Sequence, residues 1–232
     1  MAYLLLLPFQ WRALGLYIRR RQLYEQIIDG LVVATDANFP VGAGKGHARR
    51  VARIADAIAR EMRLSESMAE SVKFAALLHD IGMIGKDDLL ARPVVASEDA
   101  EELLDHVRVG AEIARELPRE EIAEAILHHH ERFDGSGYPG GLRGEAIPLA
   151  ARIVALAEVV DSMAFGIYPH PTAASWASII SHVTLEKGKG FDPDVVDAFL
   201  RSLDRDPFAI EGWSPSASDV ARSPGLSWMA TR

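Results

Sequence analysis

Histidine and carboxylate side chains recur along this sequence in a pattern that fits metal-dependent hydrolysis. Three consecutive histidines (residues 128–130) are followed by Glu131 and by a glycine-rich segment that begins at Asp134. A separate His-Asp pair stands at His79 and Asp80. Imidazole and carboxylate ligands without thiolate suit Fe, Mn, Ni, Co or Zn better than Mg or Ca. The residue types therefore predict a hydrolytic metal centre beside a substrate loop.

The elements that must position these residues are predicted to be helices. Apolar residues recur with a helical period almost throughout, and few stretches alternate long enough to indicate strands. We predict an all-α fold with helices at residues 10–36, 47–62, 66–80, 98–116, 119–131, 148–165, 172–187 and 192–203. The predicted organisation is an N-terminal helix and loop (1–45), a core domain (46–203) and a tail (204–232), either flexible or draped over the core.

Five of these helices carry a histidine or aspartate on the stripe that should be buried. His106, for example, shares a stripe with Gly110 and Ile113. The full set is His47, His79, Asp80, His106, His129, His130 and Asp161. One buried histidine is most often a hydrogen-bonded core residue, but burying all these groups separately would be costly unless each were satisfied. A shared metal cluster removes that cost for the whole set.

Seven ligands exceed the needs of one ion that keeps positions open for water and substrate. We therefore predict two ions, with Asp80 as the bridging carboxylate beside His79. Two ions ~3.5–4 Å apart can lower the pKa of a shared water and stabilise an in-line phosphoryl displacement. The chemistry indicated is hydrolysis of a phosphodiester or phosphomonoester, with His79 and Asp80 as the catalytic pair.

The composition narrows the class of partner. A net charge of −8 argues against a broad DNA or RNA surface, although a small anionic ligand remains compatible. The absence of cysteine excludes disulfides, zinc–thiolate sites and iron–sulfur clusters, and fits a reducing cytoplasm. No stretch is apolar for long enough to predict a membrane span.

The longest motifs resemble a known family. Residues 77–82 (LLHDIG) and 129–139 (HHERFDGSGYP) are similar to the HD-GYP subgroup of the HD phosphohydrolase superfamily. The likeness runs from residue 22 to residue 199 and includes segments 46–51 (GHARRV), 142–148 (LRGEAIP) and 191–199 (FDPDVVDAF). The resemblance implies an HD-domain helical bundle that encloses the metals and cleaves cyclic di-GMP to linear pGpG or to GMP.

The resemblance also implies the ligands and the ions. Family ligands match the seven residues named above, and members hold two or three metals, often iron or manganese. The third metal uses a Glu four residues before the first histidine, where this chain has Ala43. We therefore expect two divalent ions, Fe or Mn first, with Ni, Co or Zn as alternatives.

Two departures from the family pattern affect the substrate side. Met83 stands where the family has a lysine, and Lys86, one helical turn later, is either a substitute or a solvated charge. The family's Arg-Pro-Tyr-Arg segment is replaced by residues 167–170 (IYPH). Each lost charge-assisted contact would weaken binding by ~1.5–3 kcal/mol. The sequence therefore predicts a complete metal centre, but it lacks several of the cations with which the family binds the substrate phosphates.

The remaining substrate candidates lie in or near the loop 135–144. Together with Lys86 they are Gly137, Tyr138, Pro139 and Arg143. The glycines either admit a ligand or only shape the loop, Tyr138 either contacts guanine or packs the loop down, and Arg143 either approaches phosphate or is exposed. The loop is also a candidate docking site for a signalling protein, and homodimer formation is left open.

Three functions remain open from the sequence. The first is a metal-dependent cyclic di-GMP phosphodiesterase, favoured by the complete ligand set. The second is a catalytically weak or inactive module that binds the nucleotide or a signalling partner, favoured by Met83 and by segment 167–170. The third is hydrolysis of another phosphate ester, such as a different cyclic dinucleotide.

Overall fold

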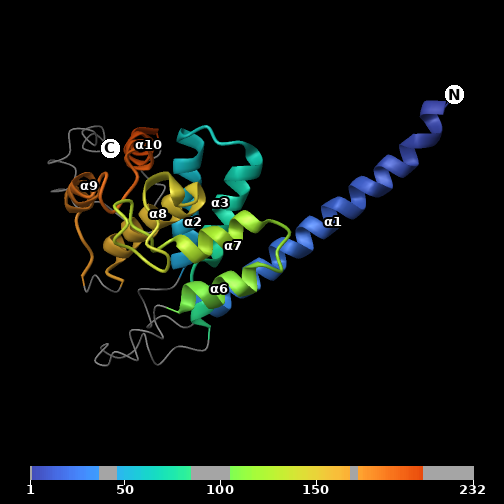
Figure 1. Ribbon diagram of the computed structural model, residues 1–232. Coiled ribbons are helices and arrows are strands. Elements are labelled where there is room, and N and C mark those ends of the chain that lie inside the picture. The colour runs from blue at the N-terminus through green and yellow to red at the C-terminus, as the bar shows by residue number, and fades with distance from the viewer. Residues whose placement is uncertain (1, 37–45, 85–104, 168–171, 206–232) are drawn as a thin grey trace.

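The structure is a computed structural model that describes residues 2–36, 46–84, 105–167 and 172–205 (Figure 1). In chain order its elements are α1 (Ala2–Asp36), α2 (His47–Glu61), α3 (Glu66–Leu78), the 3₁₀ turn η1 (Ile81–Met83), α6 (His106–Ala114), α7 (Glu120–His128), the 3₁₀ turn η2 (Gly144–Ala146), α8 (Leu149–Phe165), α9 (Trp176–Leu185) and α10 (Pro193–Arg205). These residues contain no strand, only one isolated bridge between Lys187 and Phe191. The all-α prediction is confirmed.

The helices that carry site residues end earlier than the sequence predicts. The helix predicted at 66–80 ends at Leu78, because the backbone of Asp80 (φ −96°, ψ 13°) has left the helical region. The helix predicted at 119–131 ends at His128. Because of these differences, His79 and Asp80 lie on a turn just beyond the C-terminus of α3. His129 and His130 lie on a turn just beyond the C-terminus of α7.

Other boundaries also differ from the prediction. The helix predicted from residue 10 already begins at Ala2, and the one predicted from residue 172 begins at Trp176. Ser175 starts this last helix by accepting a hydrogen bond from the backbone N–H of Ser178. The tail from residue 206 onward and the first part of the helix predicted at 98–116 lie outside the described residues.

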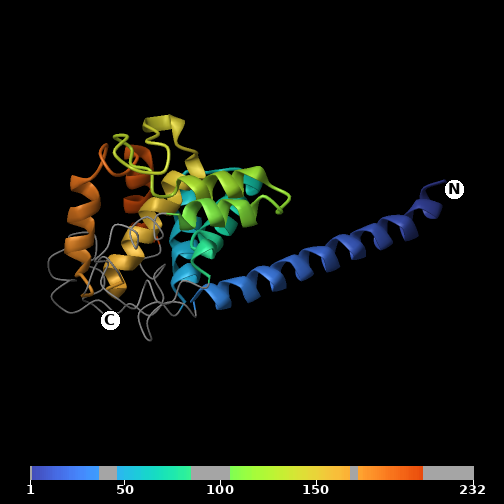
Figure 2. The ribbon, with the colours of Figure 1, turned by 60° about the horizontal axis from the view of Figure 1, so that its bottom comes forward.

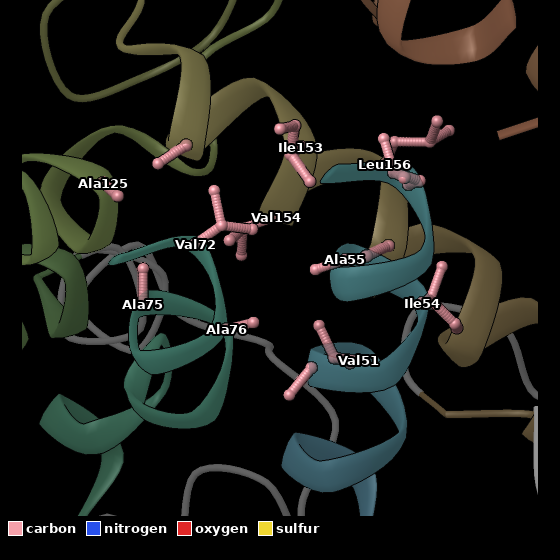
Figure 3. Close-up of a cluster of buried hydrophobic side chains, with 14 of the residues drawn as sticks. Val51, Ile54, Ala55, Val72, Ala75, Ala76, Ala125, Ile153, Val154 and Leu156 are labelled. Carbon is pink, nitrogen blue, oxygen red and sulfur yellow. The ribbon is translucent and has the colours of Figure 1, made fainter. Parts of the chain in front are cut away.

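The central part of the core lies between α2, α3, α7 and α8 (Figure 3), and α1, α9 and α10 add further buried residues to it. Many of its residues are alanines and β-branched side chains, which allow neighbouring helices to approach closely. The labelled members are Val51, Ile54, Ala55, Val72, Ala75, Ala76, Ala125, Ile153, Val154 and Leu156. All of them are buried, so these four helices form a close-packed frame beside the site.

Helix α1 extends away from this bundle (Figures 1 and 2). Near its C-terminal end Ile28 and Val32 are buried in the core, and Tyr24 contacts the edge of Phe74. Further out, Trp11 and Leu16 are exposed. Within the described residues, no helix combines the length and apolarity that crossing a bilayer requires.

Candidate metal centre

Six of the seven predicted metal ligands gather at the ends of four helices. Helix α2 begins at His47, α6 begins at His106, and the pairs His79–Asp80 and His129–His130 follow the C-termini of α3 and α7. Gly46, in a left-handed conformation (φ 78°), precedes α2 and donates its N–H to Asp36 at 2.9 Å. This contact joins the end of α1 to the start of α2 and so helps to place His47.

The histidine rings form a continuous cluster in which all but the half-buried His130 are buried. The ring centroids of His47 and His79 lie 5.2 Å apart, those of His79 and His129 lie 5.3 Å apart, and those of His129 and His130 lie 4.1 Å apart. His106 contacts both His129 and His130, at 5.6 and 5.2 Å. Residues separated by up to 83 positions in the sequence (from 47 to 130) therefore meet, as the helical stripes predict.

The cluster divides into two groups of potential metal ligands. The aspartate group consists of His47, His79 and Asp80, and the imidazole group consists of His106, His129 and His130. Within each group the candidate ligand atoms all lie within 4.8 Å of one another. Each group therefore offers three ligand atoms at a separation suited to one ion.

Asp80 lies between the two groups. Its Oδ2 is 3.1 Å from His79 Nε2 and 3.8 Å from His47 Nε2. Its Oδ1 is 3.6 Å from Nε2 of His106, in the imidazole group. One carboxylate thus presents a different oxygen to each group, which is the geometry that a bridging ligand needs.

The orientation of two rings fits metal binding. Nδ1 of His79 donates to the carbonyl of Ala76 at 2.9 Å, and Nδ1 of His129 donates to the carbonyl of Ile126 at 2.7 Å. When the ring is neutral and its proton is held on Nδ1, the lone pair of Nε2 points into the cluster. Nε2 of His129 is buried and has no hydrogen-bond partner in the described part of the chain. A metal ion would satisfy this otherwise costly atom.

The electrostatics differ between the two groups. Burial and the charge of neighbouring imidazoles hold the pKa of His129 well below its usual value and lower that of His130 to about 3. Both rings are therefore neutral near pH 7, which is the form that binds metal. Burial would raise the pKa of Asp80, but His79, His106 and His47 hold it well below its usual value, so this carboxylate is ionised.

Asp161 lies beside the cluster but in neither group. This residue of α8 is fully buried, and its Oδ2 lies 2.7 Å from Nδ1 of His47. Arg50 donates to its Oδ1 from Nε at 2.7 Å and to its Oδ2 from Nη2 at 3.0 Å. Both carboxylate oxygens are engaged, so the ligand role assigned to Asp161 from the sequence stays a prediction.

Glu158 is a site residue that the sequence analysis missed. It lies on α8 three residues before Asp161, and its Oε2 is 3.9 Å from Nδ1 of His130. Burial raises its pKa to about 7, with His79 opposing and Asp80 adding to the increase. The i, i+3 spacing from Asp161, which puts both residues on one side of the helix, could have identified it.

The loop 135–144 borders the imidazole group. The ring of Tyr138 stacks on that of His130, with centroids 4.9 Å apart and planes inclined by 27°. Gly137 lies so close to the chain that a Cβ would stand 2.3 Å from the amide nitrogen of Arg132. Of the predicted substrate residues, Tyr138 thus lies beside the centre, and Gly137 is required by packing.

The buried side chain of Glu131 anchors this loop through backbone hydrogen bonds. Its carboxylate accepts the backbone N–H of Gly140 at 2.6 Å and that of Leu142 at 3.1 Å. On the other side, Arg132 donates to Glu186 at 2.7 Å and to Ser136 at 3.0 Å. The loop is therefore held at both ends, which fixes the Tyr138 ring over His130.

The remaining substrate candidates do not join the cluster. Arg143 is exposed, and no contact with either group is found for it. Met83, at the family's lysine position, is buried, and so is Ile167. Lys86, Ala43 and His170 lie outside the described residues.

The fold and the site together, an all-α bundle with two adjoining groups of His and Asp side chains, are those expected of a metal-dependent protein. Residues 37–195 match the family model described as HD domain, so the chain belongs to the HD-domain family. The resemblance to the HD-GYP subgroup is confirmed by its curated relatives.

Three relatives illustrate this similarity. The chain is 38% identical to the cyclic di-GMP phosphodiesterase response regulator RpfG of Xanthomonas campestris pv. campestris (69% of this chain, 43% of that protein). It is 37% identical to a cyclic di-GMP phosphodiesterase of Thermotoga maritima (67% and 43%). It is 33% identical to 3'3'-cGAMP-specific phosphodiesterase 2 of Vibrio cholerae (82% and 37%). The chain therefore spans less than half the length of these relatives.

Two solved structures share the fold. The cyclic GMP-AMP-specific phosphodiesterase V-cGAP3 of V. cholerae aligns with a TM-score of 0.61 at 24% identity, over 82% of this chain and 51% of that one. Bd1817, an HD-GYP-type protein of Bdellovibrio bacteriovorus, aligns with a TM-score of 0.55 at 20% identity, over 68% and 51%. At these identities the likeness concerns the fold alone.

Proposed function

We propose that the protein is a metal-dependent phosphodiesterase that hydrolyses cyclic di-GMP to linear pGpG, to GMP or to both. The observation that carries this proposal is the position of Asp80, with one oxygen facing each group of histidines. Neither a core packing role nor a single-ion site explains that arrangement. The names of the relatives, which are cyclic dinucleotide phosphodiesterases, support the substrate class.

The proposed cofactor is a pair of divalent ions, Fe or Mn first, with Ni, Co or Zn as alternatives. The aspartate group would hold one ion and the imidazole group the other, with Asp80 shared and Glu158 as a further carboxylate near His130. When bound, such a pair supplies an acidified water nucleophile and stabilises charge on the phosphoryl oxygens. The ionised Asp80 compensates the cationic charge at the centre of the site.

The protein's own residues would place the substrate against this centre. The loop 135–144 is fixed by Glu131, which sets the Tyr138 ring beside His130. An aromatic ring at that position can stack a nucleobase, while Gly137 and Pro139 shape the backbone around it. Contacts from Lys86 and Arg143 to phosphate remain predictions, as do a signalling partner at this loop, a homodimer and a cytoplasmic location.

A second candidate function is a module that binds the nucleotide or a partner without efficient hydrolysis. Met83 favours it, because a buried thioether replaces the cation that the family places three residues after the aspartate. The residues that match the family's metal ligands are all present, however, and a binding module would not require the whole set. The phosphodiesterase therefore remains the better-supported function.

The test is to purify the protein anaerobically, measure its metal content and incubate it with cyclic di-GMP and, separately, with 3'3'-cGAMP. Chromatography should detect pGpG or GMP from cyclic di-GMP, together with two equivalents of metal. Tight nucleotide binding without product would contradict the enzyme and favour the binding module. If only 3'3'-cGAMP is hydrolysed, the substrate is a cyclic dinucleotide other than cyclic di-GMP.

A further inference from the structure

Helix α1 has two apolar faces, and within the described residues only one of them is covered. On the covered face, Ile28 and Val32 are buried against the bundle. On the other face, Leu16, Leu23 and Ile27 are 65%, 58% and 54% exposed. The two faces are about a third of a turn apart, because successive residues of a helix are rotated by about 100°. The bundle therefore leaves the second face open.

The open face follows a seven-residue repeat. When the positions of the repeat are lettered a to g and Ile27 is placed at a, the exposed a and d positions are those of Leu16, Leu23, Ile27, Gly30 and Ala34. The sequence continues the same register back through residues 13, 9 and 6, which are Ala, Phe and Leu. Between residues 6 and 34, the one charged residue at an a or d position is Arg20. We call this row of a and d positions the heptad seam.

A seam with this period indicates a partner helix. Apolar residues at a and d over about three to four heptads or more keep one stripe of a helix against another helix as the two supercoil. The buried Ile28 and Val32 take positions b and f, so a helix at the seam leaves their contacts with the bundle intact. Leu14 and Ile18 are also exposed, but they take positions b and f as well and lie outside the seam.

The projecting part of α1 needs such a partner for its stability. The helix runs from Ala2 to Asp36, a length of roughly 50 Å, and extends away from the bundle (Figures 1 and 2). Among the described side chains of α1, none before Tyr24 belongs to the core or packs against it. An isolated helix is marginal in water, and most helical stability in proteins comes from packing of an apolar face. The heptad seam supplies that face.

We propose that the heptad seam binds a second copy of the chain, seam against seam, as a two-stranded coiled coil. A second copy carries the same seam, so a two-fold pair covers the exposed leucine and isoleucine side chains of both helices at once. Gly30 and Ala34 are small, which leaves room for the partner helix close to the bundle. Arg20 interrupts the seam, and a single polar residue at an a position fixes the register of a coiled coil at a cost in stability.

The experiment is sedimentation velocity on the full chain over a series of concentrations. The wild-type protein should form a reversible dimer. Leu23→Glu and Ile27→Glu should each weaken the dimer by about 100-fold or more, because each places a carboxylate in the seam of both copies. Arg20→Leu should tighten it by about tenfold, because it removes the polar interruption. The matched controls are Leu14→Glu and Ile18→Glu, which make the same changes on the same helix outside the seam and should leave the dimer intact.

Circular dichroism and thermal unfolding show which variants are folded, and Arg20→Leu tests the seam by a gain if the glutamate variants are not. A wild-type protein that stays monomeric throughout the concentration series would overturn the proposal. Equal weakening by Leu14→Glu and Leu23→Glu would also overturn it, because association would then not use the seam. Flotation with phosphatidylserine-containing vesicles, lost equally in those two variants, would assign the helix to a lipid surface instead. None of these outcomes depends on the metal centre.

Discussion

The two ligand groups are built differently although they adjoin each other at Asp80. The aspartate group contains a carboxylate, and its His47 is backed by Asp161 and Arg50. The imidazole group has no carboxylate among its three members, and the ring of Tyr138 lies over His130. The comparison indicates that the aspartate group would hold an ion partly through charge, whereas the imidazole group would offer a neutral ligand set beside the loop 135–144.

Asp80 is what joins the two groups, so Asp80→Ala is expected to have the largest effect. Loss of the shared carboxylate removes a ligand from both groups at once, and cyclic di-GMP turnover should fall to the level of the metal-free protein. Metal analysis and product chromatography would measure the effect. Asp197→Ala, at a half-buried aspartate of α10 that pairs with Lys187 away from the ligand groups, is the control and should change neither. Undiminished turnover in Asp80→Ala would eliminate the two-metal mechanism.

His129→Gln should affect one group only. The change removes an imidazole of the imidazole group whose buried Nε2 has no hydrogen-bond partner in the described part of the chain. Metal content should therefore fall from two equivalents to one, and hydrolysis should be lost. Metal analysis after gel filtration tests this. His182→Gln, on α9 against Phe191, should retain both ions. Loss of both ions from His129→Gln would show that the groups do not bind independently.

Glu131→Gln should leave metal binding by both ligand groups unchanged and should alter only the anchoring of the loop 135–144. The amide keeps one oxygen acceptor but turns an NH₂ toward the second backbone N–H, so one charge-assisted hydrogen bond worth ~1.5 kcal/mol is lost. KM should rise by about tenfold with metal content unchanged, as steady-state kinetics would detect. The exposed Glu145 offers the control Glu145→Gln. An unchanged KM would mean that the loop does not position substrate.

The six histidine and aspartate members of the two groups could be predicted from sequence because helical periodicity fixes which side chains share a buried face. The same periodicity does not fix where a helix ends or how its face is centred. Ile113 was predicted on the stripe of His106, yet it is 44% exposed; Gly110 and Ala114, at four-residue steps from His106, are buried instead. A shift of one position was enough to misplace it.

The two carboxylates of α8 show the remaining limit. Glu158 and Asp161 lie on one side of the helix, and nothing in their spacing tells which histidine each one faces or which of them is paired with an arginine. That choice depends on the contact between Arg50 and Asp161, which are 111 residues apart. The anchoring of the loop by Glu131 likewise depends on backbone N–H groups, which leave no signature in residue types.

Anomalous diffraction from crystals grown with Mn²⁺ would test the central claim most directly. Two peaks are expected, ~3.5–4 Å apart, one among His47, His79 and Asp80 and the other among His106, His129 and His130, with a carboxylate oxygen of Asp80 facing each. A map without peaks in this cluster, or with manganese bound elsewhere on the surface, would contradict the two-ion centre.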